Sequence, residues 1–312
     1  MSFPISGVHL DPVYLMGIGF VVGMLGGFFG VGGSFLAGPA LFAMRVPMNF
    51  VVGTDLAHIV GKSIVAARKH RALGNIDMKL GLLMVVGTIG GVEVGAQCIQ
   101  ALKRTAHIDA AVGLTFIVIL LGISGFMTWE SLKTLRSGKA AKAAGRAPPG
   151  LHPSGKDRSA ASHIAEGLRR LISWPPFVAL PVSGIARVSI WAILAVAFVG
   201  GFFSGFLGGG AGYIRMPCLI YLLGVPTHIA VGTDLFEIII SASYGTVSHA
   251  LKGNVDILIA LVMHTGAAIG AQIGATLTQF FVGPRIRMAF IPLPLIGAAF
   301  LVHGLLMGHP GK

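Results

Sequence analysis

The chain has 312 residues, of which 54% are apolar and only 11% are Asp, Glu, Lys or Arg, whereas soluble globular domains carry about 25% charged residues. Its 46 glycines are about double the usual share. A soluble fold of this size cannot bury so many apolar side chains, and a disordered chain would carry far more charge. The composition therefore predicts a polytopic all-α membrane protein and excludes soluble enzymes, secreted scaffolds and nucleic-acid-binding proteins.

The net charge of +12 is concentrated in one segment. Residues 130–187 contain ten Lys or Arg and three acidic residues, which is +7 of the total. Such a basic loop is typical of the cytoplasmic side of a membrane protein, so we attribute the charge to topology and expect no nucleic-acid partner. Cys98 and Cys218 each lie alone in apolar surroundings, and the N-terminus has no basic region. We expect no disulfide and no cleavable signal peptide.

Apolar runs mark the expected membrane helices. Because the hydrocarbon core takes about 20 residues to cross, most of these runs predict spanning helices. Two runs, 34–45 and 213–224, are too short; each follows a glycine cluster and contains a proline, Pro39 or Pro217. Short Gly/Pro-interrupted segments predict broken helices. The runs are 13–30, 34–45, 50–67, 80–102 and 109–129, then 188–207, 213–224, 229–248, 257–281 and 288–307.

The two groups of runs share one sequence pattern. FFGVGGSFLAGPAL from Phe28 aligns with FLGGGAGYIRMPCL from Phe206. The offset there is 178. After one added residue it becomes 179, so that GTDL at 53–56 aligns with GTDL at 232–235, and the whole match covers about 70 residues. We interpret the chain as an internal duplication, which is typical of transporters and channels.

The duplication divides the chain into a first membrane repeat, 1–129, a basic cytoplasmic loop, 130–187, and a second membrane repeat, 188–312. Counting Lys and Arg on each side favours inverted repeats over parallel ones. Within the loop, residues 130–160 have the composition of a disordered linker. Residues 163–173 carry an apolar face opposite two arginines, which predicts either an interfacial helix or a linker with accidental periodicity.

Ionisable groups inside a membrane span are costly and therefore mark functional sites. Asp55, His58 and Lys62 are spaced i, i+3, i+7 and so share one stripe of a helix. Asp234 and Glu237 occupy the matching stripe of the second repeat. We expect His58, Lys62 and Glu237 to lie on a pathway for ions; the alternative is a neutral, internally bonded polar contact between helices. Thr54–Asp55 and Thr233–Asp234 contact substrate in this interpretation; the alternative is that they are helix N-caps.

The glycine clusters predict sites where the backbone leaves the helix and approaches a ligand. A helix that begins there points unpaired N–H groups at the ligand, which suits an anion. Arg215 would add a fixed positive charge. Close helix packing is the alternative explanation of the glycines. The residues expected at this anion site are Gly30, Gly32, Gly33, Ser34, Gly208, Gly210, Ala211, Gly212 and Arg215.

The duplicated pattern, a glycine-rich GGFFGVGGSFLAGPAL or GGFFSGFLGGGAGYIRMPCL followed by VGTDL and a GN-x-D turn, resembles the TauE/SafE sulfite exporter family of membrane permeases. The resemblance implies a multi-pass protein of the inner membrane that moves sulfur-containing anions such as sulfite, thiosulfate or organosulfonates. The direction of transport and the oligomeric state stay open.

We expect a secondary transporter of small anions whose coupling to protons involves His58, Lys62 and Glu237. The alternative is an uncoupled anion channel or facilitator of the same fold. No P-loop, dinucleotide fingerprint or HExxH pattern occurs, so we expect no cofactor, no metal and no enzymatic activity.

Overall fold

The computed structural model describes residues 1–104, 108–143, 174–281 and 283–307. Two short hairpins, β1–β2 (Ser2–Phe3, Val8–His9) and β3–β4 (Phe177–Leu180, Ile185–Ser189), accompany the helices. The helices are α1 (Pro12–Phe29), α2 (Ser34–Ala43), α3 (Met48–Ala72), α4 (Met78–Leu102), α5 (Ile108–Ala143), α7 (Ile190–Leu207), α8 (Gly212–Pro217), α9 (Thr227–Leu251), α10 (Ile257–Leu277), α11 (Gly283–Phe290) and α12 (Pro292–Met307).

Seven helical segments in the described residues are long and apolar enough to cross a membrane. They include α1, α3, α4, α7 and the first part of α5, Ile108–Trp129. At 1.5 Å per residue, the 25 residues of α3 and of α9 each exceed the thickness of the hydrocarbon core. The predicted fold class, an all-α polytopic membrane protein, is confirmed.

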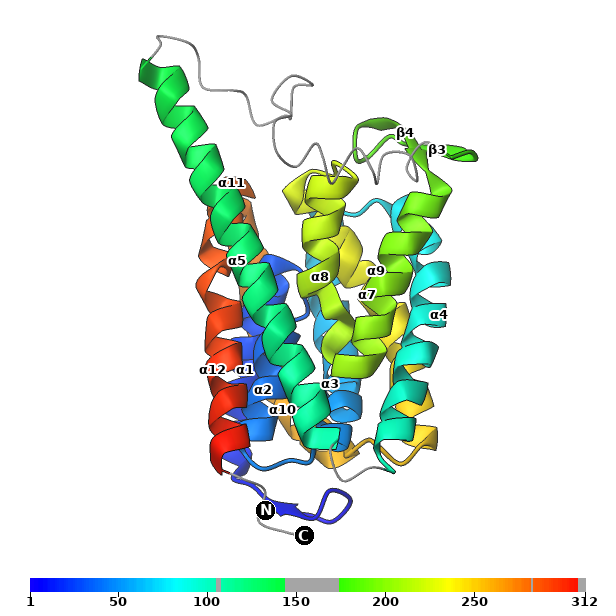
Figure 1. The fold of residues 1–312 in the computed structure, drawn as a ribbon, viewed down its shortest axis with the longest axis vertical. Helices are drawn as coiled ribbons and strands as arrows, with labels where there is room; N and C mark the ends of the chain where they lie inside the picture. Colours follow the sequence, from blue (N-terminus) through cyan, green and yellow to red (C-terminus); the bar gives the residue numbers. More distant parts are fainter. Residues whose placement is uncertain (105–107, 144–173, 282, 308–312) are drawn as a thin grey trace.

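The helices form one bundle around α3 and α9, which pack against each other (Figure 1). On one side of this pair α1 packs along α10, and on the other side α4 packs along α7. The short helix α2 contacts α12, and α12 lies beside α5. The two helices with the charged stripes therefore lie inside the bundle.

Glycine allows the flanking helices to approach closely. A Cβ added to Gly23 of α1 would overlap the backbone of Ala267 in α10. A Cβ added to Gly201 of α7 would overlap the backbone of Thr88 in α4. In the alignment of the two halves, Gly23 corresponds to Gly201 and Thr88 corresponds to Ala267. Each contact therefore joins a glycine of one half to the equivalent partner position in the other half. Part of the glycine content thus does serve close packing, as is common between membrane helices.

Two hydrogen bonds between the halves also join equivalent positions. The Asp256 backbone N–H donates to Thr54 Oγ1, and the Asp77 backbone N–H donates to Thr233 Oγ1, each at 2.9 Å. In Figure 1 the hairpin before α1 lies at the end of the bundle opposite the hairpin before α7. The inverted internal duplication stays a prediction, with which these contacts are compatible.

The segment 130–187 differs in part from its prediction. The α5 backbone continues as a helix to Ala143, so the expected linker is wrong for 130–143. The Lys- and Ala-rich sequence there favours helix strongly enough to extend α5. Residues 177–189 form the β3–β4 hairpin. The predicted interfacial helix at 163–173 lies outside the described residues.

Candidate functional site

Both predicted helix breaks are present. Between α1 and α2 the backbone turns through Gly30, Gly32 and Gly33, all of which have φ between 69° and 76°. Between α7 and α8 it turns through 208–211, where Gly210 has φ 78°. These are left-handed conformations that residues with a Cβ rarely adopt. The prediction of broken helices is therefore confirmed, and the glycines in the breaks have a different role from those between packed helices.

The two breaks face each other inside the bundle. A Cβ added to Gly32 would lie 3.2 Å from the carbonyl oxygen of Gly209. A Cβ added to Gly210 would lie 3.1–3.2 Å from side-chain carbons of Ile59 and Ile238. Ile59 belongs to α3 and Ile238 to α9, and both are fully buried. With Leu56 these isoleucines form an apolar plug between the breaks.

The second half carries a tight cluster of buried ion pairs. Arg215 Nε lies 2.8 Å from Asp234 Oδ1, and Arg215 Nη1 lies 2.5 Å from Glu237 Oε2. All three side chains are completely buried. The hydroxyls of Thr88 and Ser241 also face Glu237. The guanidinium expected to serve the anion is therefore already occupied by two carboxylates.

The first half carries a looser polar chain on α3. Asp55 Oδ1 lies 3.4 Å from His58 Nδ1, and Lys62 Nζ lies 3.2 Å from the same nitrogen. Because a carboxylate only accepts and an ammonium only donates, Nδ1 either donates to Asp55 or accepts from Lys62, depending on the tautomer of the ring. The predicted stripe of Asp55, His58 and Lys62 is confirmed as a contiguous chain. All three are at most 2% exposed.

Buried polar atoms around the breaks lack partners. His58 Nε2 and the Tyr213 hydroxyl make no hydrogen bond among the described residues. Tyr213 stacks on Phe116, with ring centroids 5.8 Å apart, and is close enough to Asp55 to interact electrostatically. Buried donors without partners are rare because desolvation is not repaid. They are available to a bound ligand.

The N-cap alternative for the GTDL sequences is wrong. The helix α3 begins at Met48, after Pro47, and α9 begins at Thr227, after Pro226, so both aspartates lie well inside their helices. The hydroxyls of Thr54 and Thr233 instead accept backbone N–H groups from the opposite half. The actual N-caps with side-chain hydrogen bonds include Asp77 and Asp256, at the starts of α4 and α10.

The remaining predicted residues lie at the two breaks. Gly208, Gly210, Ala211 and Gly212 are all buried, and a Cβ on Gly212 would lie 2.6 Å from Asp234 Oδ2. Ser34 begins α2, but its side chain is outside the described part. Gly30 contacts Val231 of α9.

Sequence reasoning missed two members of the site. The sequence does not mark Tyr213 as a site residue, because a tyrosine in a short apolar helix is commonly an interfacial anchor. His264 of α10 lies against Gly61 and interacts electrostatically with Lys62; a histidine within an apolar run was its only signal. Within the described ranges no group of three His, Cys, Asp or Glu is placed to hold a metal. The described cysteines, Cys98 and Cys218, are free and half-buried.

The fold and site define a multi-span membrane protein in which two helix breaks meet beside buried charges. The chain belongs to the sulfite exporter TauE/SafE family, whose profile matches residues 15–301. The family predicted from the glycine clusters and the GTDL sequences is thus confirmed.

Curated relatives are similar over nearly the whole chain. The probable membrane transporter protein YunE of Bacillus subtilis is 26% identical over 302 residues, which cover 94% of this chain and 98% of the relative. A probable membrane transporter protein of Methanocaldococcus jannaschii is 24% identical over 286 residues, 87% of this chain and 88% of the relative. YdhB of Bacillus subtilis, also a probable membrane transporter, is 38% identical over 89 residues, 28% of this chain and 36% of the relative. No solved structure matches the chain.

Proposed function

We propose that the chain is a secondary transporter of small sulfur-containing anions in the cytoplasmic membrane, and that each anion moves with a proton. Membership of the sulfite exporter family supports the substrate class. The names of the curated relatives support a transporter rather than an enzyme. The observation that carries the proposal is the balance of buried charge where the two breaks meet.

The net charge of these buried groups is negative when all carboxylates are ionised. Lys62 and Arg215 are the cations of the cluster, against the carboxylates of Asp55, Asp234 and Glu237. With all three carboxylates ionised, the cluster has one negative charge in excess. A buried site with excess negative charge repels an anion, because charges interact strongly away from water. At least one added proton makes the cluster neutral and allows an anion to bind.

Glu237 is the carboxylate that we assign to this proton. It holds Arg215 Nη1, so protonating Glu237 removes one of the two carboxylates from the guanidinium. The freed N–H can then donate to the anion, as guanidinium groups do to sulfonate-like oxygens. Asp234 keeps Arg215 oriented through Nε. Proton and anion would therefore bind together.

The other donors come from the first half. We propose that His58 Nε2–H, the Lys62 ammonium and the Tyr213 hydroxyl contact the anion. The backbone N–H groups at 32–34 lie at the start of α2, where a helix N-terminus favours negative charge. The helix α8 has only six residues, so at the second break Arg215 supplies the positive charge. The Ile59–Ile238 plug would have to move aside for the anion to pass.

Flux in proteoliposomes tests this function. Purified protein should accumulate labelled sulfite, thiosulfate or an organosulfonate when the anion-containing side is acidic, and accumulation should stop when the pH gradient is collapsed. Glu237→Gln keeps the shape and hydrogen-bonding capacity of the side chain but cannot titrate. It should abolish gradient-driven accumulation and leave anion exchange between the two sides largely intact.

His58→Gln is the companion variant, because the histidine is the other side chain in the cluster that we expect to exchange a proton. If accumulation driven by the pH gradient survives in both variants, proton coupling through this cluster is wrong. If wild-type flux never responds to the gradient, the uncoupled channel or facilitator replaces the coupled carrier. If none of the sulfur anions moves, the substrate class is wrong.

A further inference from the structure

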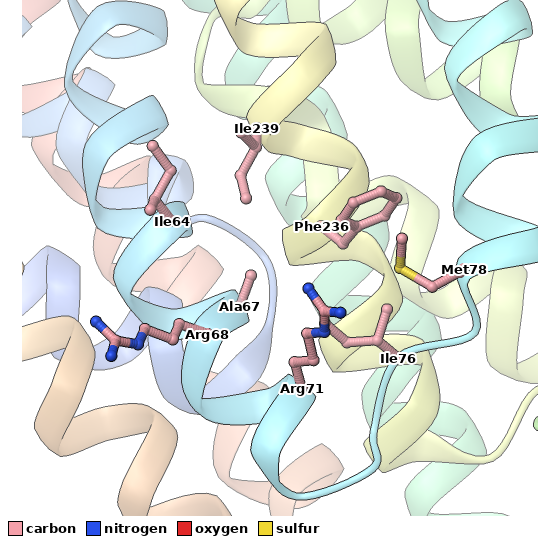
Figure 2. Close-up of a pocket in the computed structure, with 8 residues that line it drawn as sticks. All are labelled: Ile64, Ala67, Arg68, Arg71, Ile76, Met78, Phe236 and Ile239. Carbon is pink, nitrogen blue, oxygen red and sulfur yellow. The ribbon is translucent and has the colours of Figure 1, made fainter.

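A cavity of about 190 Å³ lies between α3 and α9, away from the charged cluster. Its walls are apolar and include Ile64, Phe236 and Ile239 (Figure 2). Ile64 is 50% exposed and so belongs to the outer surface of the bundle. An apolar hollow on the outer surface of a membrane bundle faces lipid tails.

One end of the cavity carries two cations. Arg68 and Arg71 line it, and both are exposed residues in the last two turns of α3. Figure 2 shows the guanidinium of Arg71 in the space between α3 and Phe236, whereas Arg68 points to the other side of α3. Among the described residues neither arginine forms an ion pair with a carboxylate. Arg71 therefore offers an unused pair of donors beside apolar walls.

The cavity opens at the end of the bundle where α5 ends and the β3–β4 hairpin lies (Figure 1). The turn after α3 is bound to the β3–β4 hairpin: Lys79 Nζ donates to the Ala179 carbonyl at 3.0 Å, and the Ser183 hydroxyl donates to Asp77 at 2.7 Å. The hairpin forms the end of the basic segment 130–187. Because basic loops stay on the cytoplasmic side, this end faces the inner leaflet, which is rich in anionic lipid.

The opposite end of the bundle provides an internal comparison. At the alignment offset of 179, Arg68 corresponds to Val247 and Arg71 to Ala250, both exposed residues near the end of α9. The matching surface at the other end therefore lacks both cations. The bulky apolar walls change as well, because Ile64 corresponds to Ser243 and Phe236 to Ala57. The two arginines are thus specific to this end, whereas Lys103, Arg104 and Lys252 lie at the opposite end.

We propose that this cavity binds one anionic phospholipid of the inner leaflet, with its acyl chain against Ile64, Phe236 and Ile239 and its phosphate on Arg71. A guanidinium binds phosphate oxygens through two parallel hydrogen bonds. Basic pockets between transmembrane helices on the cytoplasmic side are suited to such headgroups. The apolar walls select a lipid over a free phosphate ion.

Lipid titration of the intact protein in detergent tests the proposal. Phosphatidylglycerol should raise the melting temperature of the wild type, and phosphatidylcholine and inorganic phosphate should not. Arg71→Gln should lower the affinity for phosphatidylglycerol roughly tenfold or more, as the loss of a charge-assisted hydrogen bond predicts. Ile64→Trp, which fills the apolar cavity and keeps both arginines, should weaken binding as well. Native mass spectrometry should detect one retained phosphatidylglycerol in the wild type and none in Arg71→Gln.

Arg104→Gln is the matched control, because it removes one exposed cation from the other end of the bundle. It should bind phosphatidylglycerol like the wild type. Equal loss in Arg104→Gln and Arg71→Gln would mean unspecific attraction of lipid to net charge and would overturn the proposal. An equal response to inorganic phosphate would identify a simple anion site instead. Unchanged binding in Arg71→Gln and Ile64→Trp would place the lipid elsewhere.

Discussion

The charged stripes of α3 and α9 occupy matching positions but differ in how their charges are satisfied. On α9 both carboxylates are held by one guanidinium, at 2.8 and 2.5 Å. On α3 the contacts are longer, at 3.4 and 3.2 Å, and His58 Nε2 has no partner within the described residues. One half is an ion-pair cluster in which Arg215 Nη2 has no hydrogen-bond partner among the described residues, and the other is a looser polar chain.

This difference assigns different tasks to the two halves. A buried pair in good geometry resists ligands until one partner is neutralised, whereas unused donors can accept an anion directly. We therefore expect α9 to control when the anion binds and α3 to provide the donors that hold it. Each of the following substitutions tests one part of this difference between the two halves.

Arg215→Gln should have the largest effect. It leaves Asp234 and Glu237 buried without a cation, and breaking such a pair costs about 3–5 kcal/mol of unfolding free energy. Thermal unfolding in detergent should show the loss, and anion flux should be abolished. The triple variant Arg215→Gln/Asp234→Asn/Glu237→Gln removes all three charges and should recover much of the stability but no transport. A single variant as stable as the wild type would contradict the description as an ion-pair cluster.

Gly210→Leu should have the next largest effect. A side chain at φ 78° adds roughly 1–2 kcal/mol of backbone strain, and it would overlap Ile59 and Ile238. Protection of the protein by substrate should disappear while membrane insertion persists, and Gly32→Leu should behave in the same way. Gly224→Leu is the control, because Gly224 has the same φ but open space around it. Retained binding in Gly210→Leu would place the anion away from the breaks.

Lys62→Gln tests the looser polar chain. Lys62 contacts His58 but no carboxylate directly, so its loss should reduce stability less than Arg215→Gln does. Affinity for the anion should still fall about tenfold, because a charged donor is lost. Binding isotherms on the same preparations as the unfolding experiments separate the two quantities. An affinity equal to that of the wild type would remove Lys62 from the anion site.

Thr54→Val and Thr233→Val should have the smallest effect. Each removes the acceptor of one backbone N–H from the opposite half, which costs about 1 kcal/mol. Because the two hydrogen bonds have the same length, the two losses in thermal stability should be equal. A clear inequality would show that the matched positions differ energetically as well as chemically.

The breaks and the stripes could be predicted because they depend on local sequence. Glycine before a short proline-containing run identifies a broken helix, and the i, i+3, i+7 spacing places Asp55, His58 and Lys62 on one face whatever surrounds the helix. The apolar run from residue 50 predicts the start of α3 to within two residues, and only the N-cap alternative at Thr54–Asp55 places it too late. The helix instead starts after Pro47, a common starting signal.

The partners across the bundle could not be predicted. Arg215 meets Glu237 only because α8 packs against α9 after the break, and a sequence pattern contains no information on that packing. The apolar plug was missed for the same reason, since Ile59 and Ile238 look like ordinary core residues. Local patterns therefore identified which residues carry charge, but not which of these charges neutralise one another.

The interleaved packing of the halves has a consequence for biosynthesis. Gly23 of α1 fits against Ala267 of α10, and nearly the whole chain separates them. At translation rates of about 5–20 residues per second, α1 would wait roughly 10–50 s in the bilayer before its partner is made. During that interval its glycine surface is covered only by lipid or by other proteins of the insertion machinery. The first half is therefore the part of the nascent chain most exposed to quality control, and synthesis of α10 ends that exposure.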